Sequence, residues 1–181
     1  MLARFDSFQT LDDPQLTKMK LAAVEFAWHM VGKGSPRWLT LLGKSGAGKT
    51  MLARIVNRIF NYNLRGTVSY ESSTIVQRYD GGFITWNKLA TYLREGEFRV
   101  FDDICAHDFV VLDDIGSEHS TAFTNAKLFE FMNRSLGKWR VITGNLTLEQ
   151  VGERLDVRIA SRMIRDGNVV VDVDVKDWSL R

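Results

Sequence analysis

The sequence predicts an α/β fold in which helices flank a five-stranded parallel sheet. Short apolar runs at residues 38–42 and 109–112 indicate strands that are buried on both faces, which is typical of parallel sheets. Segments with apolar residues at helical spacing separate these runs, so strands and helices alternate along the chain. A glycine-rich loop follows the first strand and leads into a helix, which is a common arrangement for binding phosphate.

Capping residues and apolar spacing place the individual elements. The first helix is predicted over residues 12–31, because Asp12 or Asp13 can cap it and Pro14 falls near its first turn. Further helices are predicted at residues 49–60, 121–136 and 147–164, with one or two more within 73–107, of which 86–95 is the best defined. The strands are predicted at residues 38–42, 67–72, 109–112, 140–143 and 168–175.

Length and composition indicate one folded domain. The chain has 181 residues, of which 45% are hydrophobic and 25% charged, so a disordered or collagen-like chain is excluded. We expect a single domain over residues 1–181, with an N-terminal segment and helix (1–37) followed by a phosphate-binding core (38–181). The formal charge is +2 and the isoelectric point is about 8.7, which permits a nucleic-acid partner without arguing for one.

Cysteine content and hydropathy bear on location. Cys105 is the single cysteine, which excludes an internal disulfide framework and a cysteine-based zinc site and suits a reducing compartment. No apolar run approaches the roughly 20 residues of a membrane span, and the opening residues lack the apolar core of a secretory signal. We therefore expect a cytoplasmic protein without a membrane partner.

Residues 43–50, GKSGAGKT, match the phosphate-loop pattern GxxxxGK[ST] at every fixed position. Glycines let backbone N–H groups turn toward phosphate oxygens, and the following helix adds the partial positive charge of its amino end. The lysine is expected to reach the β- and γ-phosphates, and the threonine hydroxyl to bind Mg²⁺. A chance glycine-rich turn is disfavoured by the strand before it and the helix after it. The predicted nucleotide-binding residues are Gly43, Ser45, Gly46, Ala47, Gly48, Lys49, Thr50 and Met51.

Two aspartates end the apolar run at residues 109–112. At the carboxyl end of a parallel strand, Asp113 is expected to hold Mg²⁺ together with Thr50, and Asp114 to orient and deprotonate the attacking water. The alternative is a strand that ends in a solvated turn. Asp113 to Gly116 also fits the DxxG pattern of GTPases, but the chain lacks the [NT]KxD guanine motif, so ATP is favoured over GTP.

Two further features add polar groups after these motifs. Asn145 follows the apolar strand 140–143, where its amide could hold water or contact the γ-phosphate, or simply form a turn with Gly144. On the last predicted helix, four arginines at spacings of four, four and three form one basic face: Arg154, Arg158, Arg162 and Arg165. Such a face is either solvated or supplies a guanidinium to a transferred phosphoryl group, in some cases from a neighbouring subunit.

The phosphate loop, the acidic strand end, the polar strand tip and the arginine-bearing helix follow one another along the chain. In this order they resemble the initiator and helicase-loader branch of the AAA+ ATPases, and they are most similar to the DnaC, DnaI and IstB group. The motifs are GKSGAGKT (43–50), VVLDDIGSE (110–118), VITGNL (141–146) and RLDVRIASRM (154–163). The resemblance runs from about residue 5 to the C-terminus. It implies a P-loop NTPase with an AAA+ core and no separate lid domain, which binds ATP and Mg²⁺ and hydrolyses ATP.

The same resemblance implies roles for individual residues. Asp113 matches the magnesium acid, Asp114 the catalytic base and Asn145 the first sensor. Arg162 matches the arginine finger that acts on ATP held by the next subunit of an oligomer, and Arg158 assists it. Arg181 matches the second sensor, which acts on the γ-phosphate of its own subunit.

An extra helix between the second and third strands of this family follows single-stranded DNA. Here it would lie within residues 83–105, where aromatic and basic side chains alternate. Such a mixture suits base stacking and phosphate contacts, or equally an amphipathic helix that buries its aromatic rings. The side chains in question are Trp86, Lys88, Tyr92, Arg94, Phe98 and Arg99.

The resemblance implies a replicative helicase loader, with two departures. About forty residues precede the phosphate loop, fewer than the helicase-binding domain of typical loaders needs, so another surface, another partner or a truncated chain is implied. The lid that follows the core in DnaA-type initiators is also missing, so weak hydrolysis by an isolated chain is expected. The alternatives are an IstB-like transposition ATPase on duplex DNA, a nucleotide-gated adaptor with little hydrolysis, and a small P-loop kinase.

Overall fold

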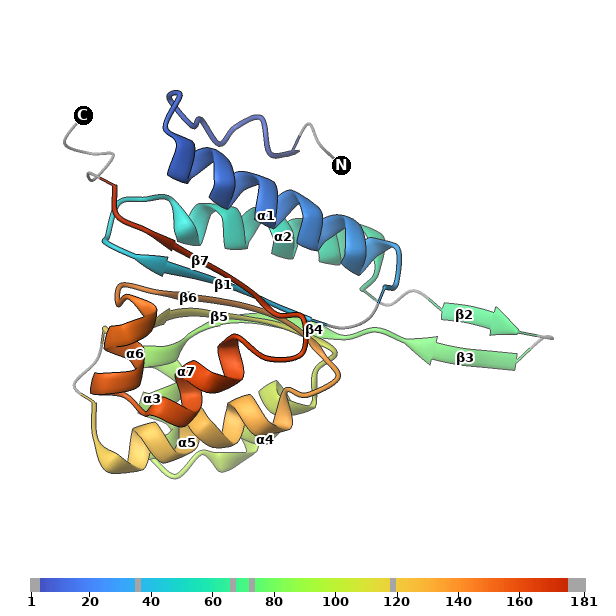
Figure 1. Ribbon diagram of the computed structural model, residues 1–181. Helices are drawn as coiled ribbons and strands as arrows, with labels where there is room; N and C mark the ends of the chain where they lie inside the picture. Colours follow the sequence, from blue (N-terminus) through green and yellow to red (C-terminus); the bar gives the residue numbers. More distant parts are fainter. Residues whose placement is uncertain (1–3, 35–36, 66–67, 72–73, 118–119, 176–181) are drawn as a thin grey trace.

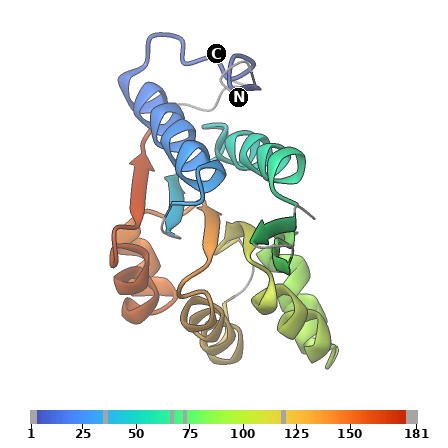
Figure 2. The same ribbon diagram turned by 90° about the vertical axis from the view of Figure 1, so that its right-hand side faces the viewer.

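The computed structural model describes residues 4–34, 37–65, 68–71, 74–117 and 120–175, and it has three layers. Helices α1 (Pro14–Val31) and α2 (Lys49–Asn63) cover one face of the central sheet (Figure 1). The opposite face is covered by five helices: α3 (Trp86–Arg94), α4 (Phe98–Ala106), α5 (Ala122–Arg134), α6 (Leu148–Arg154) and α7 (Val157–Met163). Figure 2 shows the same layering from the side.

The central sheet has five strands in the order β4-β5-β6-β1-β7, and every pairing in it is parallel. The strands are β1 (Trp38–Gly43), β4 (Gly81–Thr85), β5 (Phe109–Ile115), β6 (Trp139–Gly144) and β7 (Val169–Val173). The predicted fold class is therefore confirmed. Because all five strands run the same way, their carboxyl ends meet at one edge, where such sheets bind ligands.

One of the predicted sheet strands was wrong. Residues 67–72 were expected in the sheet, but β2 (Val68–Glu71) pairs with β3 (Thr74–Arg78) in a separate antiparallel hairpin that projects from the core (Figure 1). The edge strand is instead β4, within a segment expected to be helical. The glycines at positions 81 and 82 interrupt the run of apolar residues that would otherwise indicate a strand. A Cβ atom at Gly81 would lie 2.6 Å from the Phe60 ring, so close packing explains that glycine.

The helix predicted over residues 147–164 is two helices. Helix α6 ends at Arg154, and Asp156 caps α7 by accepting a hydrogen bond from the Arg158 N–H at 2.8 Å. An aspartate that can cap a new helix competes with continuation of the old one. The four arginines therefore do not share one continuous face, and Arg165 lies beyond the end of α7.

Two apolar clusters fill the spaces between the layers. One joins α1 and α2 to the sheet and includes Phe5 and Phe8 from the N-terminal segment. The other joins α3 to α7 to the opposite face and includes Trp86, which is fully buried. As expected, α1 is capped by an aspartate, since Asp13 Oδ1 accepts from two backbone N–H groups of its first turn. Among the described helices, none is long and apolar enough to cross a membrane.

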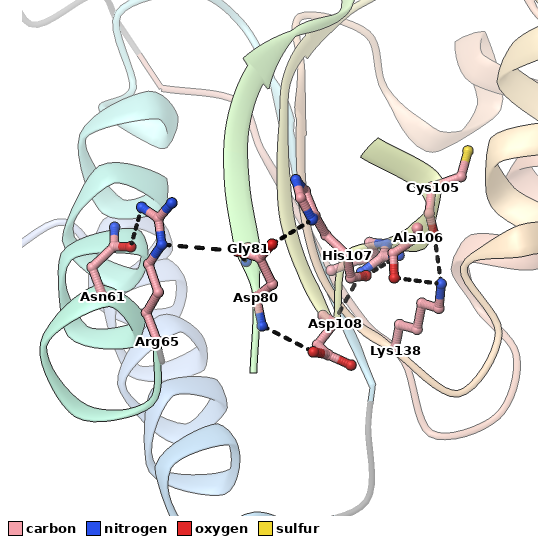
Figure 3. A network of polar contacts seen from close by, with 10 residues as sticks. Asn61, Arg65, Asp80, Gly81, Cys105, Ala106, His107, Asp108 and Lys138 are labelled. Carbon is pink, nitrogen blue, oxygen red and sulfur yellow. Dashed lines mark hydrogen bonds and ion pairs between the residues drawn. The ribbon is translucent and has the colours of Figure 1, made fainter. Parts of the chain in front are cut away.

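A polar network ties together the edge at which the strands begin (Figure 3). Lys138 donates to the backbone carbonyls of Cys105 and Ala106 at the end of α4. Asp80 lies just before β4, and its Oδ1 accepts the backbone N–H of Gly81. Its Oδ2 lies 3.4 Å from His107 Nδ1. These contacts join α4 to the beginnings of β4 and β6.

The buried guanidinium of Arg140 completes this edge. It donates to the carbonyls of His107, Asp108 and Trp139 and to the hydroxyl of Ser135, at 2.8 to 3.2 Å. Burial lowers the pKa of Arg140, because the charged form is taken out of water. The side chain therefore acts as a four-way hydrogen-bond donor inside the fold.

Candidate functional site

The carboxyl ends of the strands surround a pocket of about 370 Å³. Its walls come from the β1–α2 loop and from the ends of β4, β5 and β6. The lining residues are Ser45, Gly46, Gly48, Lys49, Thr50, Thr85, Asp113, Asp114, Thr143 and Asn145. Eight of these ten are residues that the sequence predicts for nucleotide, metal or catalysis, and the other two are Thr85 and Thr143. The pocket therefore gathers polar groups that are up to about a hundred residues apart in sequence.

Two glycines fix the shape of the β1–α2 loop. Gly43 ends β1 with φ +115°, and a Cβ atom there would lie 1.9 Å from the Val173 carbonyl oxygen. Gly48 has φ +82° at the amino end of α2, and a Cβ atom there would lie 2.6 Å from the ring of Phe8. Any other residue would clash and would be strained at both positions. The loop is thus pinned between β7 and the N-terminal segment.

The amino end of α2 supplies positive potential to the pocket. Helix α2 begins at Lys49, with no side-chain cap and no acidic residue in its first turn. Its first backbone N–H groups therefore keep their hydrogen-bonding capacity and the partial positive charge of the helix end. An anion such as a phosphate group fits this position.

Lys49 is buried, with 6% of its surface exposed, and it lies across the loop. Its ammonium group donates to the carbonyls of Gly43 and Lys44 at 2.7 and 2.6 Å, and to Asn145 Oδ1 at 3.1 Å. Desolvation lowers the pKa of Lys49 to about 8, although nearby carboxylates, Asp114 first among them, raise it. A bound polyphosphate would place negative charge next to this buried ammonium and compensate its positive charge.

The two strand-end aspartates occupy different environments. Asp113 is buried, and its Oδ1 accepts from Thr50 Oγ1 at 2.9 Å and from Thr143 Oγ1 at 2.6 Å. Asp114 is half-buried and adopts φ +64°, where the pairing of β5 with β6 shifts register. This left-handed residue turns the second carboxylate away from the strand, so the two acids present their oxygens separately.

Thr143 is a site residue that the sequence reasoning missed. It is buried, and besides its bond to Asp113 its oxygen accepts the backbone N–H of Asp114 at 2.9 Å. One hydroxyl thus fixes both aspartates. The available signal was a threonine after two apolar residues and just before the Gly-Asn pair.

Asn145 links the lysine to the second aspartate. Its Nδ2 donates to Asp114 Oδ1 at 2.7 Å, while its Oδ1 accepts from Lys49. The amide orientation satisfies both partners, since the nitrogen faces a carboxylate and the oxygen faces an ammonium. The polar strand tip is therefore part of the site and not only a turn.

Some predicted site residues lie outside this pocket. Ala47 is buried within the loop, and Met51 is exposed and lines a neighbouring groove. Arg158 pairs with Asp156 at 2.7 Å and packs over the Phe129 ring, while Arg162 is half-buried on α7; neither lines the pocket. Arg181 lies outside the described residues.

The segment predicted to follow DNA divides into buried and exposed parts. Trp86 is fully buried in the core, so that ring is unable to stack on a base, and this part of the expectation is wrong. Phe98 is 48% exposed, and its ring faces the Lys127 ammonium at 5.5 Å. The basic side chains Lys88, Arg94 and Arg99 are exposed. The exposed surface of this segment therefore carries both charges, since Glu95, Glu97, Asp102 and Asp103 are exposed as well, beside the one largely exposed ring of Phe98.

The donors at the pocket fit a magnesium nucleotide. Thr50 Oγ1 and Asp113 Oδ1 are hard oxygen donors 2.9 Å apart, which suits Mg²⁺ bound together with phosphate oxygens. Lys49 and the amino end of α2 suit the phosphates themselves. Among the described residues no group of three or more histidine, cysteine or acidic side chains forms a separate metal site.

Comparison with solved structures identifies this architecture. A crystal structure of the DnaC helicase loader superposes with a TM-score of 0.70 at 19% identity, covering 93% of this chain and 95% of that chain. A crystal structure of DnaI superposes with a TM-score of 0.68 at 20% identity, covering 94% of this chain and 88% of that one. The chain has the fold of the DnaC and DnaI structures.

The fold is also similar to that of the replication initiator DnaA. A structure of DnaA bound to AMPPCP and single-stranded DNA superposes with a TM-score of 0.62 at 16% identity, covering 84% of this chain. This chain spans 45% of that DnaA chain. No protein-family model and no curated protein matches the sequence.

Proposed function

We propose that this chain is an ATPase that binds ATP with Mg²⁺ at the β1–α2 loop and serves as a loader of a replicative helicase onto DNA. The observation that supports hydrolysis best is the meeting of Lys49, Asp113, Asp114 and Asn145 in one pocket. A phosphate-binding loop alone would explain nucleotide binding, whereas the half-buried carboxylate of Asp114 beside that loop adds a base.

In the proposed reaction, water attacks the γ-phosphorus of ATP and the bond to the β–γ bridging oxygen breaks. Asp114 accepts the water proton, and Asn145 holds the carboxylate in place. Lys49 neutralises charge on the transferred phosphoryl group. Thr50 and Asp113 would hold Mg²⁺, which supplies further charge neutralisation. The products are ADP and inorganic phosphate.

The pocket is proposed to need a second copy of the chain. Neither Arg158 nor Arg162 lines the pocket of its own chain, so each is available to a neighbour's triphosphate. We assign the finger to Arg162 and an assisting role to Arg158, whose guanidinium is already paired with Asp156. Arg181 is proposed to contact the γ-phosphate in its own subunit. Weak hydrolysis by the isolated chain follows from this arrangement.

Phosphate release tests the proposal. Asp114→Asn keeps the shape of the side chain and should bind ATP while losing most hydrolysis. Arg162→Ala should also hydrolyse poorly, and Arg165→Ala, an exposed arginine beyond α7, serves as its matched control. Mixing Asp114→Asn with Arg162→Ala chains should restore part of the activity, because some interfaces then combine an intact base with an intact finger.

Absence of rescue at every mixing ratio would contradict a finger acting between subunits. Full activity of Asp114→Asn would remove that residue from catalysis. Phosphate release that stays at background with single-stranded DNA and a replicative helicase present would favour the nucleotide-gated adaptor instead. Stimulation by duplex in preference to single-stranded DNA would favour an IstB-like transposition ATPase.

A further inference from the structure

A second groove lies beside the nucleotide pocket, between the N-terminal segment and the outer face of α2. It consists of two adjoining cavities of about 400 and 280 Å³. Both are lined by Ser7, Ile55 and Arg58, so they form one continuous depression. Its wall is firm, because Phe5 and Phe8 anchor the N-terminal segment in the core.

Three arginines line this groove. Arg54 and Arg58 lie one turn apart on α2, and Arg4 reaches the groove from the N-terminal segment. All three are exposed, and within the described part of the chain none forms an ion pair with a carboxylate. Helix α2 contains no acidic residue, and the exposed Asp6 lines neither cavity.

The contacts that these arginines make involve neutral groups. Arg4 donates to the Arg58 carbonyl at 3.4 Å and lies over the Tyr62 ring at 4.6 Å. The Arg54 guanidinium lies over the Phe83 ring at 5.2 Å. Such contacts orient the guanidinium groups without compensating their charge. The groove therefore concentrates positive charge in a protein whose net charge is only +2.

An exposed aromatic ring lies on α2 beyond the two cavities. Tyr62 is 76% exposed, one turn after Arg58. From Thr50 to Tyr62 the helix rises about 18 Å, at roughly 1.5 Å per residue. A strip of this length exceeds what the sugar and base of one nucleotide occupy. Those two groups are also uncharged, so three guanidinium groups are more than a nucleoside requires.

We propose that this groove binds the sugar–phosphate backbone of single-stranded nucleic acid, with Arg4, Arg54 and Arg58 on phosphates and Tyr62 stacked on a base. The proposal deepens the DNA association in the proposed function and rests on it. An exposed ring favours unpaired bases over a duplex, whose bases are already stacked. Apolar Met51 and Ile55 beside the arginines suit the sugar edge of the strand.

The groove is contiguous with the nucleotide pocket. Thr50 lines both, with its hydroxyl bonded to Asp113 on the pocket side. A strand in the groove would therefore lie next to bound nucleotide. If each ligand changes the affinity for the other, the two effects must be equal in size.

Fluorescence anisotropy of a fluorescein-labelled 20-nucleotide oligo-dT tests the groove at several salt concentrations. The Arg54→Gln/Arg58→Gln chain should bind at least tenfold more weakly than the unmodified chain. A plot of log affinity against log salt concentration has a negative slope, to which each phosphate contact of a single strand contributes about 0.7. For this variant the slope should become shallower by about 1.4, because two contacts are lost. Lys18→Gln/Arg165→Gln removes two exposed charges elsewhere and should leave both quantities unchanged.

Each of the following outcomes would contradict the proposal that this groove binds single-stranded nucleic acid. Equal binding by the groove variant and the unmodified chain would leave DNA association intact but place it on another surface. A loss of AMPPCP affinity without a loss of oligo-dT affinity would make the groove part of the nucleotide site. An equal loss for a 20-base-pair duplex would remove the preference for single strands. Failure of the unmodified chain to bind oligo-dT would remove DNA association as well, whereas phosphate release tests the ATPase separately.

Discussion

The side-chain amide of Asn145 donates to Asp114 Oδ1 at 2.7 Å, so the polar tip of β6 holds the second carboxylate at the end of β5. The same amide accepts from the Lys49 ammonium at 3.1 Å. A group that enters between the lysine and the amide, such as a γ-phosphate, would compete for both contacts. Asn145 is therefore positioned so that nucleotide bound at the β1–α2 loop would change the orientation of the Asp114 carboxylate.

Replacing Asn145 with alanine should lower ATP hydrolysis about 10- to 100-fold while ATP affinity changes only a few-fold. The carboxylate of Asp114 would lose its one described side-chain donor, and general-base catalysis depends on its orientation. Steady-state phosphate release and equilibrium binding of AMPPCP separate the two effects. An unchanged hydrolysis rate would reduce Asn145 to a turn residue.

Thr143→Val should impair hydrolysis at least tenfold, because it removes the hydroxyl that contacts both aspartates and keeps the β-branched shape. Thr143→Ser keeps the hydroxyl and should remain within about threefold of the unmodified chain. Half-maximal activity of the valine variant should also require more Mg²⁺, since Asp113 loses a positioning bond. A role in packing alone predicts the reverse order, with valine tolerated better than serine.

Nucleotide binding should take up a proton at alkaline pH. The lowered pKa of Lys49, about 8, means that the free site is mostly uncharged at pH 9 and mostly charged at pH 7. A bound triphosphate favours the ammonium form, so binding at pH 9 should take up most of one proton and affinity should fall as pH rises through 8. Calorimetry in two buffers of different ionisation enthalpy measures this uptake.

Lys44→Ala provides the control for this titration, because Lys44 is exposed and pairs with Asp174. It should show the same proton uptake as the unmodified chain. Binding at pH 9 that takes up no proton would show that the free site holds Lys49 charged, contrary to the effect of its burial.

The buried guanidinium of Arg140 should matter for folding and not for chemistry. Arg140→Met should lower the free energy of unfolding by about 2–4 kcal/mol, because the carbonyls and the hydroxyl that it satisfies would be left buried without a donor. Denaturant unfolding measures the change, with the exposed Arg94→Met as a control. Loss of no more than 0.5 kcal/mol would mean that water replaces the guanidinium there.

Local signals predicted the parts of the fold that depend on neighbouring residues. The phosphate loop is specified by eight consecutive residues, and the aspartates and Asn145 follow apolar strands, so parallel strands suffice to bring them to one edge. Thr143 also follows an apolar run, but no local pattern indicates that its hydroxyl contacts both aspartates. Its role depends on how β5 and β6 are registered, which sequence spacing does not give.

Other errors share a physical cause, because contacts distant in sequence decided the outcome. Residues 81–85 form the edge strand because Gly81 packs against Phe60 and the segment pairs with β5, although its apolar pattern is weak. Trp86 is buried by helices that follow it, so an aromatic residue in a basic segment gave a misleading indication of stacking. The helix predicted over residues 147–164 breaks because Asp156 caps α7. The regular spacing of the arginines suggested one continuous helix instead.

Equilibrium binding of Mg·ATP to the unmodified chain and to Lys49→Ala tests the central claim most directly. The account predicts saturable binding with one nucleotide per chain, and an affinity at least 100-fold lower for the alanine variant at pH 7, where Lys49 is charged. The Lys44→Ala variant should bind like the unmodified chain. Equal affinities for the unmodified chain and Lys49→Ala, or no binding by either, would contradict a nucleotide held by this loop.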